Sequence, residues 1–291
     1  MTVFDLPAAR ALIEAALVED IGRGDLTTQL TVPADERASA AIVAKQDGVL
    51  AGAALVDGVF AALGARDLSI THHAADGSPF AAGVTLVTIE GRAADLLTGE
   101  RTALNFLQEL CGVATLTRRF VDAVADTRAR IIDTRKTTPG WRALQKYAVR
   151  MGGGYNHRGG LDDGILIKDN HLVAAGGVSA AVAAARRGAP HSVRVQVECA
   201  TLDQVDEALA AEADAILLDN MSLDQLTAAV RRIAGRSIVE ASGGVTLASV
   251  RAIAETGVDL ISVGELTHSA PAIDLSMKMH HRSSKMPKGR A

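Results

Sequence analysis

The chain has 291 residues, of which 48% are hydrophobic and 22% are charged, and its formal net charge at pH 7 is −4. This length and composition predict a globular protein with a large core, built as two domains or as one barrel with an addition. No segment reaches the ~18 uninterrupted apolar residues of a membrane span, and the acidic balance with only eight aromatic residues argues against nucleic-acid binding.

The first part of the chain mixes short helices and short strands. Helices are predicted at 7–19 and 53–63 from the spacing of apolar residues. Strands are predicted at 38–44, 49–51, 68–72 and 84–90, separated by glycine-containing turns. This pattern indicates an α+β domain with antiparallel pairing. A long helical stretch follows from residue 93 to about residue 124, with a break expected near Gly112.

From residue 129 onward, strands alternate with helices. The expected strands are 129–134, 164–168, 193–198, 215–219, 237–241 and 260–263. The expected helices are 139–150, 173–187, 202–211, 222–234 and 247–256. Such alternation predicts a parallel sheet with crossover helices, whose strands are buried on both faces.

Polar residues recur at the end of each of these strands. In chain order they are Asp133-Thr134-Arg135-Lys136, Lys168-Asp169-Asn170, Glu198, Asp219-Asn220, Ser242-Gly243-Gly244 and Gly264-Glu265. Polar residues at the C-terminal ends of successive strands predict an α/β barrel with its active site at that rim. The alternative is a doubly wound sheet, which would gather its chemistry at one switch point.

Residues 129–171 concentrate positive charge, with eight lysines and arginines against four aspartates. Clustered cations between apolar runs suit a small ligand that carries several negative charges, and a solvated basic face is the alternative. Thr138-Pro139 is typical of a helix start, after which Arg142, Lys146 and Arg150 form a basic stripe that faces either ligand or solvent.

Three glycine segments and two carboxylates add to the expected site. Gly152-Gly153-Gly154 precedes His157 and Arg158, and is interpreted either as a shaped binding loop or as a flexible one. The glycine turns at 242–244 and 264 resemble phosphate cradles of late barrel strands. Glu198 and Asp219 end adjacent strands, where they could hold Mg²⁺ through a substrate pyrophosphate or pair with Lys168 or Arg158.

Other classes of site find no support in the sequence. Cys111 and Cys199 lack metal or redox spacing, so we expect reduced thiols. No Walker motif and no Gly-x-Ser-x-Gly elbow are present. The N-terminal residues lack a secretory signal pattern, so we expect a cytoplasmic protein.

The chain resembles the quinolinate phosphoribosyltransferase family over nearly its full length. The resemblance is carried by ordered motifs, namely Glu19-Asp20-Ile21-Gly22, residues 24–28, residues 99–105, residues 133–137, residues 152–154, residues 156–158, residues 167–171, residues 218–220, residues 240–244 and residues 264–269. A paralogous family associated with molybdate transport shares several motifs, and Lys168 with Asn170 favours the quinolinate enzyme.

The resemblance implies an N-terminal α+β domain at 1–112, joined by residues 270–291, and an incomplete six- or seven-stranded α/β barrel at 113–269. It implies transfer of phosphoribosyl from 5-phosphoribosyl 1-pyrophosphate to quinolinate, with loss of CO₂, in NAD biosynthesis. It further implies Mg²⁺ but no organic cofactor, and a homodimer with active sites at the interface. A phosphate-sugar-binding barrel without activity remains the alternative from another functional class.

The site residues implied by the resemblance fall into three groups. Lys136, Lys168, Glu198 and Asp219 are the expected catalytic residues, and Glu198 and Asp219 are the expected metal contacts. The expected substrate-binding residues are Arg101, Thr134, Arg135, Lys136, His157, Arg158, Lys168, Asn170, Ser242, Gly243, Gly244, Val263, Gly264, Glu265 and His268. Residues 282–291 are expected to form a mobile polar tail.

Overall fold

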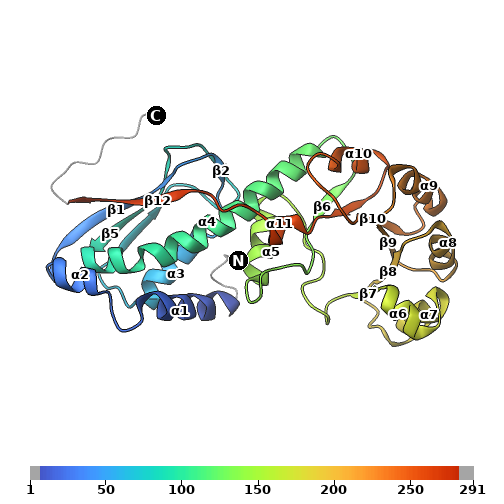
Figure 1. The fold of residues 1–291 in the computed structure, drawn as a ribbon, viewed down its shortest axis with the longest axis horizontal. Helices are drawn as coiled ribbons and strands as arrows, with labels where there is room; N and C mark the ends of the chain where they lie inside the picture. Colours follow the sequence, from blue (N-terminus) through green and yellow to red (C-terminus); the bar gives the residue numbers. More distant parts are fainter. Residues whose placement is uncertain (1–6, 282–291) are drawn as a thin grey trace. The chain divides into compact units, whose positions relative to one another are not determined.

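The computed structural model describes residues 7–281, which fall into two compact units (Figure 1). Of the described residues, the first unit comprises 7–116, Thr138–Gly152 and 270–281. The second unit comprises Thr117–Thr137 and Gly153–Ser269. The compact units therefore place the segment around residues 139–150 in the first unit, whereas the sequence analysis placed it in the barrel. No helix within residues 7–281 is long and apolar enough to cross a membrane.

The first unit is built on a four-stranded antiparallel sheet. In spatial order its strands are β12 (Leu275–His281), β1 (Arg37–Ala44), β5 (Thr85–Arg92) and β3 (Ser69–His72). A two-stranded sheet pairs β2 (Gly48–Val49) with β4 (Pro79–Phe80). The helices that lie in this unit are α1 (Pro7–Ile21), α2 (Leu26–Thr31), α3 (Ala54–Ala62) and α5 (Arg142–Met151), with most of α4 (Ala93–Ala123). The expected α+β arrangement is confirmed.

Helix α4 is one continuous helix of 31 residues, so the break expected near Gly112 was wrong. A Cβ atom at Gly112 would lie 2.3 Å from the backbone oxygen of Pro271. The glycine is therefore required for the close approach of residues 271–272 to the helix. Such contacts stabilise a helical glycine that propensity alone would disfavour.

The last described strand belongs to the first sheet. β12 pairs with β1 over seven residues, from Ala38 opposite His281 to Ala44 opposite Leu275. The side-chain amide of Gln108 on α4 donates to the carbonyl of Leu275, and the backbone carbonyl of Gln108 accepts from the N–H of Ile273. The polar tail expected at 282–291 lies outside the described residues.

The second unit contains a six-stranded parallel sheet. In spatial order its strands are β6 (Arg130–Ile132), β11 (Leu260–Ser262), β10 (Ile238–Ser242), β9 (Ala215–Asp219), β8 (Val195–Cys199) and β7 (Ile165–Ile167). The helices in this unit are α6 (Asp169–Ala175), α7 (Val178–Gly188), α8 (Leu202–Ala210), α9 (Leu223–Ile233), α10 (Val250–Glu255) and α11 (Glu265–His268), and all but α11 connect strands of the sheet. Helices α7, α8 and α9 lie along one side of the strands (Figure 1). Within the described residues β6 and β7 are the sheet's edges, so the expected incomplete barrel is confirmed with six strands.

Two of the expected helices differ from the structure because of glycines. The helix predicted at 173–187 is two helices, since Gly176 and Gly177 both have positive φ. The helix predicted from Pro139 begins at Arg142, because Gly140 has φ +83° and interrupts the helical path. Thr138 is therefore not an N-cap; instead its Oγ1 accepts a hydrogen bond from the side chain of Gln145.

Candidate functional site

A cavity of about 1010 Å³ lies at the C-terminal ends of the parallel strands in the second unit. This volume is at the upper end of the range for small-molecule sites, so it has room for two small substrates. All six strand ends contribute to its lining, as the barrel rim predicted. The expected residues that line it are Thr134, Arg135, Lys136, His157, Arg158, Lys168, Glu198, Asp219, Ser242, Gly243, Gly244, Gly264, Glu265 and His268.

One wall of the cavity is cationic. Arg135 and Lys136 follow β6, and Arg158 enters from the loop that precedes β7, where its Nη1 donates to the carbonyl of Gly164 at 2.9 Å. Burial lowers the pKa of Arg158, the nearby Arg135 guanidinium lowers it further, and Asp163 acts in the opposite direction. The Nε of Arg135 is buried without a hydrogen-bond partner in the described structure. The two guanidiniums repel each other, and the wall that carries them is partly buried. Both conditions favour binding of an anionic ligand.

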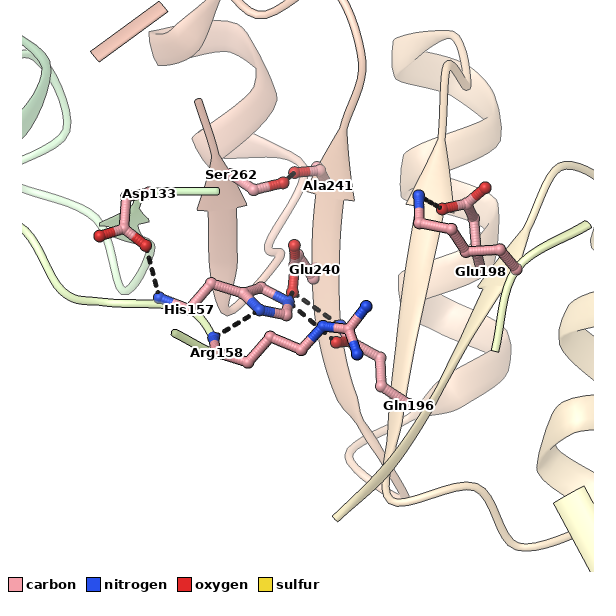
Figure 2. A network of polar contacts seen from close by, with 9 residues as sticks. Asp133, His157, Arg158, Gln196, Glu198, Glu240, Ala241 and Ser262 are labelled. Carbon is pink, nitrogen blue, oxygen red and sulfur yellow. Dashed lines mark hydrogen bonds and ion pairs between the residues drawn. The ribbon is translucent and has the colours of Figure 1, made fainter. Parts of the chain in front are cut away.

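A buried aspartate holds this wall in place. Asp133 is fully buried after β6 and accepts hydrogen bonds from the backbone N–H of His157 at 2.8 Å and from Asn156 Nδ2 at 2.6 Å. A parallel bridge between Ile132 and Tyr155 continues the same alignment. Figure 2 shows the carboxylate of Asp133 facing the backbone of His157. Asp133 thus fixes the 156–158 segment beside the strand and does not itself line the cavity.

The floor of the cavity carries a polar network that the sequence analysis missed. Glu240, on β10, is only 1% exposed and lines the cavity. Its Oε2 accepts from Gln196 Nε2 at 2.7 Å and lies 3.6 Å from His157 Nε2. The signal was available, because Glu240 precedes Ser242 by two residues and Gln196 precedes Glu198 by two. Residues two apart on a strand point to the same face.

Another part of the cavity lining carries the two expected carboxylates. Lys168 Nζ donates to Glu198 Oε2 at 2.7 Å, so the anticipated pairing with a cation is present in the structure. Asp219 ends the adjacent strand β9, and its Oδ2 accepts from Asn220 Nδ2 at 2.8 Å. Carboxylates beside a lysine in this position can accept from sugar hydroxyls while the lysine binds phosphate oxygens.

Two glycines allow the backbone of the rim to pack closely. Gly243 has φ +96°, and a Cβ atom there would lie 2.2 Å from Asn220 Oδ1. A Cβ atom at Gly264 would lie 3.1 Å from Lys136 Cδ and 3.2 Å from His268 Nε2. Side chains at these positions would therefore displace cavity residues. The helix expected at 247–256 begins only at Val250, so the 242–244 turn does not lie directly at a helix start.

Three expected site residues are not among those that line the cavity. Asn170 lies exposed in the first turn of α6, where its backbone N–H donates to Asp169 Oδ1. Val263 is 1% exposed and belongs to the core. Arg101 lies exposed on α4 in the part of that helix assigned to the first unit. The basic stripe on α5 is not one solvent face, because Lys146 is buried whereas Arg150 is exposed.

The carboxylates of the cavity suit a metal ion that is held mainly by oxygens of a bound substrate. Within residues 7–281 no group of three or more His, Cys, Asp or Glu side chains is placed to hold a metal ion. Glu198 and Asp219 are two oxygen donors at one cavity wall. Mg²⁺ commonly takes one or two carboxylates and completes its shell with waters and substrate phosphates, so these residues fit that mode.

Comparison with known proteins agrees with this arrangement. Residues 113–278 match the model of the quinolinate phosphoribosyl transferase C-terminal domain, and residues 25–111 match that of the N-terminal domain. The chain is 46% identical over 268 residues to the probable nicotinate-nucleotide pyrophosphorylase (carboxylating) of Bacillus subtilis, covering 92% of each chain. It is 44% identical over 283 residues to the Mycobacterium leprae nicotinate-nucleotide pyrophosphorylase (carboxylating), covering 94% and 98%.

A solved structure extends the likeness to the fold. The nicotinate-nucleotide pyrophosphorylase of Francisella tularensis superposes with a TM-score of 0.90 at 38% identity, covering 96% of this chain and 99% of that one. Two family models together span most of the chain, and relatives above 40% identity cover nearly all of it. The chain belongs to the quinolinate phosphoribosyltransferase family.

Proposed function

We propose that this chain transfers the phosphoribosyl group of 5-phosphoribosyl 1-pyrophosphate to quinolinate with loss of CO₂, as a step of NAD biosynthesis. The products are nicotinate mononucleotide, pyrophosphate and CO₂. The observation that carries the proposal is the cationic wall, in which Arg135 and Arg158 lie close enough that one lowers the pKa of the other. Quinolinate is a pyridine with two adjacent carboxylates, and its charge suits this wall.

The cationic wall orients quinolinate. Arg135, Arg158 and Lys136 bind the two carboxylates, with His157 beside them in the same wall. Fixed carboxylates hold the ring nitrogen toward the ribose carbon, which lowers the entropic part of the barrier. The pyridine nitrogen needs no general base, because it carries no proton when the carboxylates are ionised.

The acidic part of the lining and the rim bind the phosphoribosyl donor. Glu198 and Asp219 accept from the ribose hydroxyls, and Lys168 binds oxygens of the leaving pyrophosphate. The rim residues Ser242–Gly244 and Gly264–Glu265 complete the phosphate site. Mg²⁺, held by the pyrophosphate together with Glu198 or Asp219, would neutralise charge that develops on the leaving group.

Decarboxylation requires little of the protein. Once the ring nitrogen is bonded to ribose, the ring is a pyridinium. It then accepts the electron pair left by the departing 2-carboxylate, and a proton replaces that carboxylate at C2.

We also propose a homodimer in which Arg101 of one subunit completes the site of the other. Its support is the family resemblance and the exposed position of Arg101 on α4. The cytoplasmic location stays a prediction.

The experiment that tests the function is direct. Purified enzyme is incubated with quinolinate, 5-phosphoribosyl 1-pyrophosphate and Mg²⁺, and nicotinate mononucleotide and CO₂ are quantified. We expect both in equal amounts. Tight binding of both substrates without turnover would favour the binding-only barrel. Turnover with another aromatic acid but not with quinolinate would favour the paralogous transferase.

A further inference from the structure

The imidazole of His157 is hydrogen-bonded at both ring nitrogens. Nδ1 lies 2.7 Å from the backbone nitrogen of Arg158, whose N–H it accepts. Nε2 lies 3.1 Å from Gln196 Oε1, and Gln196 Nε2 in turn donates to Glu240 Oε2 at 2.7 Å. Figure 2 shows the Glu240 carboxylate and the Gln196 amide beside the His157 ring. The contacts form one chain from Glu240 through Gln196 to the ring.

The contact at Nδ1 determines where the ring carries its proton. A backbone N–H can only donate, so Nδ1 must present its lone pair. A doubly protonated ring would place an Nδ1–H against the Arg158 N–H across 2.7 Å. The geometry therefore requires a neutral ring with its proton on Nε2, where it donates to Gln196 Oε1.

The carboxylate of Glu240 sets the direction of the hydrogen bonds in this network. An ionised carboxylate only accepts, so it draws the NH₂ of Gln196 toward itself and leaves Oε1 facing His157. A reversed Gln196 would set its NH₂ against the Nε2–H of the ring. The Glu240 carboxylate thus selects the tautomer of His157 through the orientation of the Gln196 amide.

We propose that Glu240 and Gln196 are positioning residues that hold His157 as the neutral Nε2–H tautomer, so that His157 fixes the backbone of Arg158 for the dicarboxylate. This inference deepens the proposed function and rests on it. The positive charge of the clamp then comes from Arg135, Arg158 and Lys136, and His157 contributes none.

The environment of Glu240 indicates more than a structural role. The side chain is 1% exposed, yet it lines the cavity, and its Oε1 is buried without a hydrogen-bond partner in the described structure. A buried unsatisfied oxygen is costly, and a network that served stability alone would satisfy it. Arg135 and Arg158 line the same cavity as this carboxylate.

The tautomer is tested first in the enzyme without substrates. The ¹⁵N shifts of the His157 ring are recorded at pH 7 and assigned by their loss in His157→Asn. We expect a protonated Nε2 and an unprotonated Nδ1. In Glu240→Gln the new amide accepts or donates, so Gln196 loses its preferred direction and the Nε2–H signal should weaken. Glu255→Gln, on the exposed face of α10, is the matched control and should leave the signal unchanged. Two protonated nitrogens in the wild type would overturn the proposal.

A pair of variants then separates positioning from direct binding. The Oδ1 of His157→Asn can replace Nδ1 as acceptor for Arg158 N–H, whereas His157→Gln places its amide nearer the position of Nε2. We expect the KM for quinolinate to be at least about 10-fold higher in His157→Gln than in His157→Asn, with kcat changed less. Equal KM values in two folded variants would overturn the role of Nδ1. Absence of quinolinate turnover by the wild type would refute the proposed function. The ¹⁵N spectrum of the His157 ring is recorded without substrate, so it tests the network of Glu240, Gln196 and His157 separately.

Discussion

Replacing Arg158 by lysine tests whether the cationic wall recognises the planar geometry of a carboxylate or only its charge. Arg158 anchors one donor to the Gly164 carbonyl and lies in a partly buried wall beside Arg135. Lysine keeps the charge but cannot present two parallel donors. The variant should therefore lose about one hydrogen bond to a charged group, worth roughly 1.5–3 kcal/mol. This corresponds to a fall in kcat/KM for quinolinate of roughly 10- to 150-fold.

The assay is steady-state formation of nicotinate mononucleotide at saturating 5-phosphoribosyl 1-pyrophosphate, with circular dichroism to confirm the fold. Arg187→Lys is the matched control, because Arg187 is an exposed arginine in the last turn of α7. It should leave kcat/KM within about 2-fold of the wild type, since isolated exposed charges contribute little. Kinetics close to wild type in a folded Arg158→Lys enzyme would refute the bidentate assignment.

Three further predictions concern the rim, the thiols and the proposed dimer. Gly243→Ala should lower the free energy of unfolding by about 1–3 kcal/mol, measured by urea titration, because the new Cβ meets Asn220. It should also weaken binding of 5-phosphoribosyl 1-pyrophosphate. The control is Gly235→Ala, where φ is positive but no atom lies near the new Cβ, and it should lower the free energy of unfolding less. Burial raises the pKa of Cys111 and of Cys199 to about 12, so both thiols stay protonated below that pH. Iodoacetamide at pH 8 should leave both unmodified in the native enzyme by mass spectrometry, and rapid native labelling would contradict this. Mixing Arg101→Ala and Lys168→Ala chains should restore about a quarter of wild-type activity if Arg101 serves the partner's site, because half of the random dimers are mixed and each has one intact site; no recovery after confirmed exchange would place Arg101 in its own site.

The alternation of strands and helices correctly predicted the parallel sheet and the residues at the rim of the cavity. The ends of buried strands can be recognised in the sequence, because a polar residue directly follows an apolar run. Lys168, Glu198 and Asp219 were found in this way, and the cavity brings them together. Glu240 was missed as a site residue because it lies inside β10 and not after the strand end, so the pattern of polar strand ends does not include it.

The errors elsewhere arose where local rules and tertiary contacts disagree. Gly112 looked like a helix break, but contact with residues 271–272 requires it inside an intact helix. Gly176 and Gly177 were passed over inside a predicted helix, although two adjacent glycines are a stronger break than one. Apart from these errors, residues 138–152 group with the first unit through contacts far apart in sequence, such as Tyr147 Oη to Asp76 Oδ2 at 2.6 Å, which no local pattern encodes.

The measurement that tests the account most directly is the ratio of kcat/KM for quinolinate to that for nicotinate, with 5-phosphoribosyl 1-pyrophosphate and Mg²⁺ held constant. Nicotinate lacks the 2-carboxylate, so it would leave a cation of the Arg135 and Arg158 wall without its partner. Such a loss costs roughly 1–3 kcal/mol or more, so we predict that quinolinate is favoured by at least about 10-fold. Equal efficiency with the two acids would contradict the assignment of this wall to the dicarboxylate.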